Sequence, residues 1–138
     1  MNSKIARLAA AVMAVGLFAG PAMAGQNWPS SVVGVWGAQG NQSHLTITIE
    51  SQASTGKCRQ ITGTILDTGS GDHSTLLGFY CPSSGRFHFT RTESTSGVTF
   101  QDYSGNVSES GSSIFMGGVF AEVFTPANVG EYAFLASK

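Results

Sequence analysis

The sequence has few charged residues, 11% of its 138 positions, and no stretch with a helical period over three turns. Helices prefer Ala, Leu, Glu and Lys, whereas Ser, Thr and Gly are abundant here. The composition therefore argues against a helical protein and favours β-strands whose outer surface carries Ser and Thr.

Basic residues are especially scarce. After position 24 the chain has five basic and eight acidic residues, which gives a formal charge of about −3. Nucleic acids and anionic membranes both require clustered Lys and Arg. We therefore expect neither as a partner.

The sequence shows no recognisable catalytic or metal-binding pattern. His44, His73 and His88 lack metal-ligand spacing among themselves or with the cysteines. His88 alternates with Phe87 and Phe89, so we expect it to point outward. There is no phosphate loop, no redox CxxC motif and no general base with a credible partner. We therefore predict that the protein is not an enzyme and uses no cofactor or metal.

A long apolar run occurs only near the start of the chain. Lys4 and Arg7 precede the run Leu8–Phe18, and Ala22-Met23-Ala24 forms a small-x-small cleavage site. The run is too short to be a transmembrane helix. The pattern predicts a secretory signal peptide over residues 1–24 and a periplasmic or secreted protein.

Cysteine occurs only twice, at Cys58 and Cys81. The two residues lie on the expected strands Cys58–Leu66 and Thr75–Cys81, which would place them nearly opposite each other in a hairpin. A disulfide there would close a loop of about 24 residues and contribute roughly 3–4 kcal/mol. The alternative is two free buried thiols, which an oxidising compartment disfavours.

Strand-like runs fill the rest of the chain, separated by turns rich in Gly, Asn, Ser and Pro. The eight runs are Val32–Ala38, His44–Ser51, Cys58–Leu66, Thr75–Cys81, Arg86–Glu93, Val98–Val107, Ser113–Phe124 and Glu131–Ala136. Eight short, evenly spaced strands predict an all-β fold, either a sandwich or an eight-stranded antiparallel up-and-down barrel. We favour the barrel because it leaves no unpaired edge. The barrel domain would span residues 31–138, after a flexible segment at 25–30.

The run Ser113–Phe124 is apolar on both faces, although a strand of a small barrel should be polar outside. The residues on its second face are Phe115, Val119 and Ala121. We expect this face to bury against a second copy of the chain. The alternative is that a loop or the N-terminal segment covers it.

The order of short motifs resembles that of the avidin/streptavidin family across nearly the whole chain after residue 24. The motifs are Gly34-Val35-Trp36, Ser43-His44-Leu45-Thr46-Ile47, Ile61-Thr62-Gly63-Thr64, Leu76-Leu77-Gly78-Phe79-Tyr80, Tyr103-Ser104-Gly105 and Val129-Gly130-Glu131-Tyr132-Ala133-Phe134. The resemblance implies an eight-stranded barrel with a ligand pocket at one open end, usually in a dimer or tetramer.

The same resemblance implies which residues contact a ligand. Ser43 matches a serine that binds the biotin ureido oxygen, and Asp67 aligns with a serine that accepts a ureido N–H. The expected aromatic contacts align with or lie near the pocket tryptophans and an aspartate of the family, and they are Phe89, Tyr103, Phe120 and Tyr132. Ile65 stands where avidins have a tyrosine donor, so we expect weaker biotin binding here.

Two functions from different classes follow. The first is a non-enzymatic binder of a small ligand, with biotin as the leading candidate, at the open end of the barrel. The second is a secreted protein-binding barrel such as a periplasmic protease inhibitor, in which Gly25–Ser31 would be the inserted segment.

Overall fold

The chain forms eight β-strands in a computed structural model that describes residues 28–93, 97, 99–122 and 130–138. The strands are β1 (Gly34–Gly40), β2 (Ser43–Gln52), β3 (Arg59–Asp67), β4 (His73–Cys81), β5 (Arg86–Glu93), β6 (Thr99–Ser110), β7 (Ser113–Glu122) and β8 (Gly130–Ser137). Within these ranges no helix has the length and apolar character needed to cross a membrane. The predicted signal peptide, residues 1–24, lies outside the described residues.

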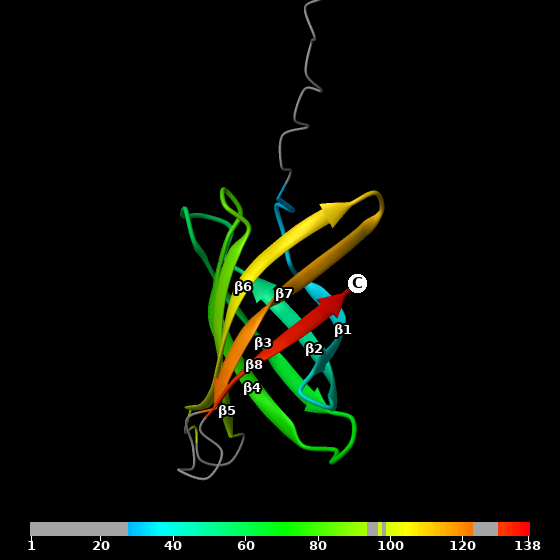
Figure 1. Ribbon diagram of the computed structural model, residues 1–138. Helices are drawn as coiled ribbons and strands as arrows, with labels where there is room; N and C mark the ends of the chain where they lie inside the picture. The colour runs from blue at the N-terminus through cyan, green and yellow to red at the C-terminus, as the bar shows by residue number, and fades with distance from the viewer. Residues whose placement is uncertain (1–27, 94–96, 98, 123–129) are drawn as a thin grey trace, which may run out of the picture.

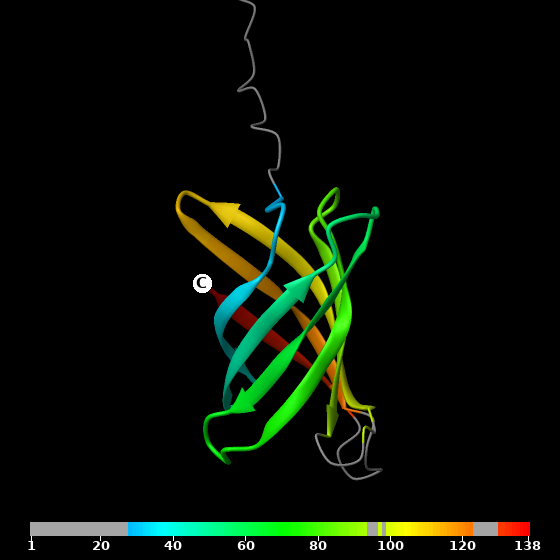
Figure 2. The same cartoon turned by 180° about the vertical axis from the view of Figure 1, so that it is seen from behind.

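The strands close into an up-and-down barrel (Figures 1 and 2). Each strand pairs antiparallel with the next, and β8 returns to pair with β1, for example Phe134 with Gly40. The predicted fold class is therefore confirmed. Closure leaves no free sheet edge, which is the physical reason for favouring a barrel over a sandwich.

The barrel has two different ends (Figure 1). We call one the mouth end, which holds the β1–β2 turn (41–42) and the β3–β4 loop (68–72). We call the other the closed end, which holds the β2–β3 loop (53–58) and the β4–β5 turn (82–85). The chain enters the barrel at the closed end (Figure 1).

Alternation of apolar and polar residues places the core inside the barrel. In β4, for example, Ser74, Leu76, Gly78 and Tyr80 are buried while the residues between them are exposed. The largest fully buried side chains are Trp36, Tyr80, Tyr103, Phe89, Ile47, Ile49, Ile61, Ile65, Leu76, Met116, Val32 and Val107. The period of two seen in the sequence thus assigns the interior correctly.

Glycines on the inward face let neighbouring strands lie close together. Gly78 lies opposite Phe89, and Gly118 lies opposite Phe134. A Cβ atom at Gly78 would lie only 2.4 Å from the Cβ of Phe89. The strands can approach this closely and still hold large rings only because these positions lack side chains.

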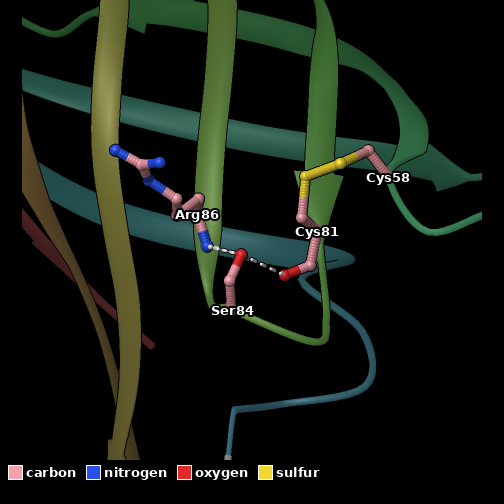
Figure 3. Close-up of a disulfide and its surroundings, with 4 residues drawn as sticks. All are labelled: Cys58, Cys81, Ser84 and Arg86. Atoms are coloured by element: carbon pink, nitrogen blue, oxygen red, sulfur yellow. Dashed lines mark hydrogen bonds between the residues drawn. A yellow bond between two sulfur atoms is a disulfide. The ribbon is translucent and has the colours of Figure 1, made fainter.

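The predicted disulfide between Cys58 and Cys81 is present, with the two Cα atoms 4.0 Å apart (Figure 3). It joins the β2–β3 loop to the end of β4. Beyond it, the Ser84 hydroxyl accepts a hydrogen bond from the Arg86 backbone N–H at 3.4 Å and lies 3.5 Å from the Cys81 carbonyl oxygen. A disulfide is compatible with an extracellular or periplasmic protein.

The described part of the N-terminal segment packs on the closed end. The Tyr80 hydroxyl donates to the Pro29 carbonyl at 2.6 Å, and the Trp36 indole donates to the Val32 carbonyl at 2.9 Å. The side chain of Gln52 accepts from the Val32 N–H and donates to the Ser30 carbonyl. Residues from 28 onward therefore form part of the packed structure.

Seven of the eight strands differ from their predicted bounds by one to three residues at one or both ends, and two of these differences have identifiable reasons. The first strand begins at Gly34 because the backbone N–H of Val32 bonds to a side chain and not to a neighbouring strand. The sixth continues to Ser110 because it pairs with the seventh up to Ser113. The predicted strand ends Val98 and Phe124 lie outside the described residues.

The outer face of the barrel carries several apolar side chains. Leu135 is 59% exposed and Phe79 is 53% exposed. The residues predicted to form a second apolar face of β7, Phe115, Val119 and Ala121, are each partly buried. The His88 side chain is exposed, as its alternation predicted, and its Nε2 lies 4.0 Å from Asp102 Oδ1.

Two buried tyrosines predict a loss of stability at alkaline pH. Burial, reinforced by Glu109, raises the pKa of Tyr80 from 10.0 to about 12, and burial raises the pKa of Tyr103 from 10.0 to about 12. Because the unfolded chain ionises first, this stabilisation is complete below pH 10 and is lost as the pH rises toward 12. Phenolate absorbance and thermal melts should show two tyrosines that ionise only as the protein unfolds. Ionisation of all three near pH 10 in folded protein would contradict this assignment.

Candidate ligand site at the mouth of the barrel

The six predicted ligand residues all lie on inward-facing positions of their strands. They are Ser43, Asp67, Phe89, Tyr103, Phe120 and Tyr132. Ser43 pairs with Gly40 at the mouth-end tip of the β1–β2 hairpin, and Asp67 pairs with Leu45 one strand further. Both polar residues are therefore at the same end of the barrel.

The four aromatic residues form one continuous stack across β5 to β8. Ring centroids are 4.8 Å apart for Phe89 and Tyr103, and 5.1 Å apart for Tyr103 and Phe120. The last step, from Phe120 to Tyr132, is 5.3 Å. These separations lie in the range of favourable ring contacts. Residues predicted from four separate strands thus belong to one cluster.

Two further aromatics, which the sequence does not predict as ligand contacts, pack on the stack from inside the barrel. Phe87 stacks on Phe89 at 5.5 Å, and Phe134 contacts Tyr103 edge-on at 5.2 Å. Phe89 and Tyr103 are fully buried among these rings, whereas Tyr132 is only partly buried. The ring most available to a bound molecule is therefore that of Tyr132, at the end of the stack.

A buried polar cluster borders the aromatic stack at the mouth end. Arg91 is only 6% exposed; its Nε donates to Ser74 Oγ at 2.9 Å and its Nη1 donates to Gln101 Oε1 at 3.2 Å. The Tyr103 hydroxyl donates to the same Gln101 oxygen at 2.8 Å. The guanidinium also lies 4.7 Å from the centroid of the Phe100 ring. Gln101 thus connects the Arg91 guanidinium to Tyr103, a member of the aromatic stack, by hydrogen bonds.

The mouth combines charges of both signs. Burial raises the pKa of Tyr103 to about 12, and the nearby Arg91 opposes that rise while Glu122 and Asp67 add to it. The Tyr103 phenol is therefore neutral at physiological pH and acts as a hydrogen-bond donor. Such a mixture of fixed donors and acceptors suits a polar ligand better than a purely apolar one.

Asp67 also has a structural role. Its Oδ1 accepts hydrogen bonds from the backbone N–H groups of Gly69 and Ser70, at 2.9 and 3.2 Å. These bonds fix the β3–β4 loop at the mouth. A ligand N–H group, as predicted for Asp67, would therefore bond to the acceptor positions of the carboxylate that these two bonds leave open.

The sequence reasoning missed Arg91, Ser74 and Gln101. A period of two from Phe87 and Phe89 places Arg91 on the same inward face, and the same period from Tyr103 includes Gln101. The alternation alone therefore includes both residues, but the usual rule that inward positions are apolar argues against a buried arginine.

The described part of the chain shows no metal centre. Among the described residues, no three His, Cys, Asp or Glu side chains are grouped so that they could hold a metal ion. No protein-family model matches the chain, and no curated protein matches it.

Proposed function

We propose that the protein is a non-enzymatic binder of a small ligand at the mouth end of the barrel. One observation carries the proposal: an aromatic stack ends in the partly buried ring of Tyr132, and the polar cluster around Arg91 bonds to Tyr103 in the same stack. The ligand would lie at the end of the stack, above rings that already fill the interior.

The chemistry of the mouth indicates the kind of ligand. The ring of Tyr132 offers an apolar face, while Ser43, Gln101 and Arg91 offer hydrogen-bonding groups. This combination suits a compact molecule with a ring and a polar edge. Biotin has this form and is the leading candidate because of the resemblance to avidins. Ile65 cannot donate a hydrogen bond, so we expect biotin to bind less tightly than in avidins.

The proposed place of action is outside the cytoplasm. The disulfide between Cys58 and Cys81 is compatible with the periplasm or the extracellular space, and the pattern over residues 1–24 is that of a cleaved export signal. We therefore propose that the protein is exported before it meets its ligand.

The alternative of a protease inhibitor with an inserted N-terminal segment has less support. The carbonyls of Pro29 and Ser30 already accept hydrogen bonds from the barrel, so this part of the segment is committed to its own domain. A segment that enters another protein must give up such contacts. The small-ligand proposal requires no rearrangement of this kind.

The proposed second copy of the chain would cover the outer face of β7 and its neighbours. Val119 pairs with Ala133, and Leu135 on the next strand is exposed beside Gly117. Apolar side chains thus continue from β7 onto β8. Association through this face remains a prediction.

Calorimetric titration of the purified protein with biotin tests the proposed site. We expect binding heat that weakens about tenfold in Tyr132→Ala, because one aromatic contact contributes about 0.5–1.5 kcal/mol. Phe79→Ala is the matched control, since it removes an aromatic ring from the outer face. The control should bind like the unchanged protein.

The possible outcomes distinguish a wrong ligand from a wrong site. No heat with biotin, together with Tyr132-dependent binding of another ring-containing polar molecule from a small-molecule library, would remove biotin and keep the site. Equal weakening by Tyr132→Ala and Phe79→Ala, or no Tyr132-dependent binder in the library, would refute a ligand site at the mouth.

A further inference from the structure

A pocket lies at the closed end of the barrel, beside the disulfide. We call it the closed-end pocket, of about 400 Å³, lined by Trp28, Ser30, Lys57, Arg59, Pro82 and Ser83. Its walls come from the N-terminal segment, the β2–β3 loop with the start of β3, and the β4–β5 turn. Figure 3 shows the disulfide that joins two of these walls. Its volume lies within the range of small-molecule sites.

The walls of this pocket are held in place. The Ser30 carbonyl accepts hydrogen bonds from Gln52 Nε2 at 2.9 Å and from Arg59 Nη1 at 3.3 Å. The Trp28 indole lies so close to Gly85 that a Cβ there would meet its Cε3 at 2.3 Å. Gly85 also has a positive φ of 67°, which a residue with a side chain rarely adopts. The Trp28 indole can therefore pack against the backbone at position 85 only because that residue is glycine.

The pocket concentrates positive charge in an acidic protein. Lys57 and Arg59 are two of the five basic residues that follow position 24. Across the described parts of the chain, the ion-pair contact found is that of His88 with Asp102, and neither pocket cation takes part in it. Both charges therefore lack a carboxylate partner among the described residues.

The guanidinium of Arg59 has an unmet hydrogen bond. Its Nε is buried and has no hydrogen-bond partner, the one such side-chain atom found among the described residues. A buried donor of a charged group that lacks a partner is costly, and such atoms call for an explanation. An oxygen acceptor with negative charge in the pocket would pair with the Arg59 guanidinium and with Lys57, and this pairing would offset the cost.

We propose that the closed-end pocket binds an oxyanion, as the carboxylate, sulfate or phosphate group of a small molecule. Arg59 and Lys57 bind the oxyanion, and the indole of Trp28 with Pro82 contacts the rest of the molecule. This site is separate from the mouth and does not rest on the function proposed there. Because the chain as a whole carries a net negative charge, we expect the anion to bind at these two cations and not over the surface in general.

Two-dimensional NMR of the two tryptophan indole N–H groups tests the proposal. The Trp28 indole lies in the pocket wall, whereas the Trp36 indole is buried and bonded to the Val32 carbonyl, so it serves as an internal reference. Sodium sulfate, sodium phosphate and sodium benzoate are the probes. We expect at least one to shift the Trp28 signal saturably and to leave the Trp36 signal unmoved. A preference for benzoate would indicate that the ligand has an apolar body, and a preference for the inorganic ions would indicate a bare oxyanion.

Three variants make the test decisive. Arg59→Gln and Lys57→Gln should each weaken the binding about tenfold, because each removes a charge-assisted contact. The exposed side chain of Lys57 makes the second variant safe for folding. Arg86→Gln is the matched control: it removes a cation near the disulfide that does not line this pocket. A Trp28 signal that none of the probes moves, or equal weakening by Lys57→Gln and Arg86→Gln, would overturn the proposal.

Discussion

Replacing Gly78 by alanine should destabilise the barrel by about 3 kcal/mol or prevent folding. The added Cβ would lie 2.2 Å from the His88 carbonyl oxygen and 2.4 Å from the Cα and Cβ of Phe89. Two of these three atoms are backbone atoms, so β4 and β5 would have to separate at the position where the aromatic stack begins. Urea unfolding followed by circular dichroism measures the effect.

Gly37 provides the matched control on β1. A Cβ there would meet no atom within 4 Å, and the residue does not have a positive φ. Gly37→Ala should therefore leave stability unchanged or raise it by up to about 1 kcal/mol, because alanine restricts the unfolded chain. Equal unfolding midpoints for the two variants would show that the strands are not in this close contact.

Removing the disulfide by the double substitution Cys58→Ser and Cys81→Ser should cost roughly 3 kcal/mol. The bond spans a sequence separation of 23 residues, so its loss frees a loop of that length in the unfolded chain. The loss should appear in chemical unfolding of the oxidised protein compared with the double variant. Dithiothreitol should lower the stability of the original protein and leave that of the double variant unchanged.

The same substitution should also affect the closed end more than the mouth. The disulfide joins the β2–β3 loop to the end of β4, next to the contacts of the N-terminal segment with Tyr80 and Gln52. Amide hydrogen exchange should therefore increase around these residues before it increases at the mouth. Uniform loss of protection across the barrel, or no change in stability, would contradict this role of the disulfide.

Much of the barrel could be predicted because each strand has one buried face. Phe87 and Phe89 alternate with exposed residues, and β5 has the predicted bounds, Arg86–Glu93. The first strand was less predictable because Val32 has the apolar character of a strand residue, yet it bonds to the side chain of Gln52. Side-chain contacts over long sequence distances leave no periodic signal.

The candidate site was predictable only in part, for a related reason. The resemblance implied the four stacked aromatics as ligand contacts, and each of them occupies an inward position of its strand. The polar cluster was not expected, because the burial of Arg91 depends on partners from two other strands. Whether an inward arginine is tolerated is decided by such partners, and a single sequence does not reveal them.

The resemblance to avidins predicted an eight-stranded barrel, which the fold confirms, and a ligand at the mouth, which stays a proposal. The two expectations are independent, because a fold does not fix which ligand it binds.

Mapping ligand contacts by NMR tests the central claim most directly. The isotope-labelled protein is mixed with ring-containing polar small molecules, biotin among them, and backbone and side-chain signals are followed. The account predicts saturable shifts at Ser43, Gln101 and Tyr132 and none at Val35 or Leu77 on the outer face. Shifts confined to the outer face, or no saturable shift at the mouth with any of these molecules, would contradict it.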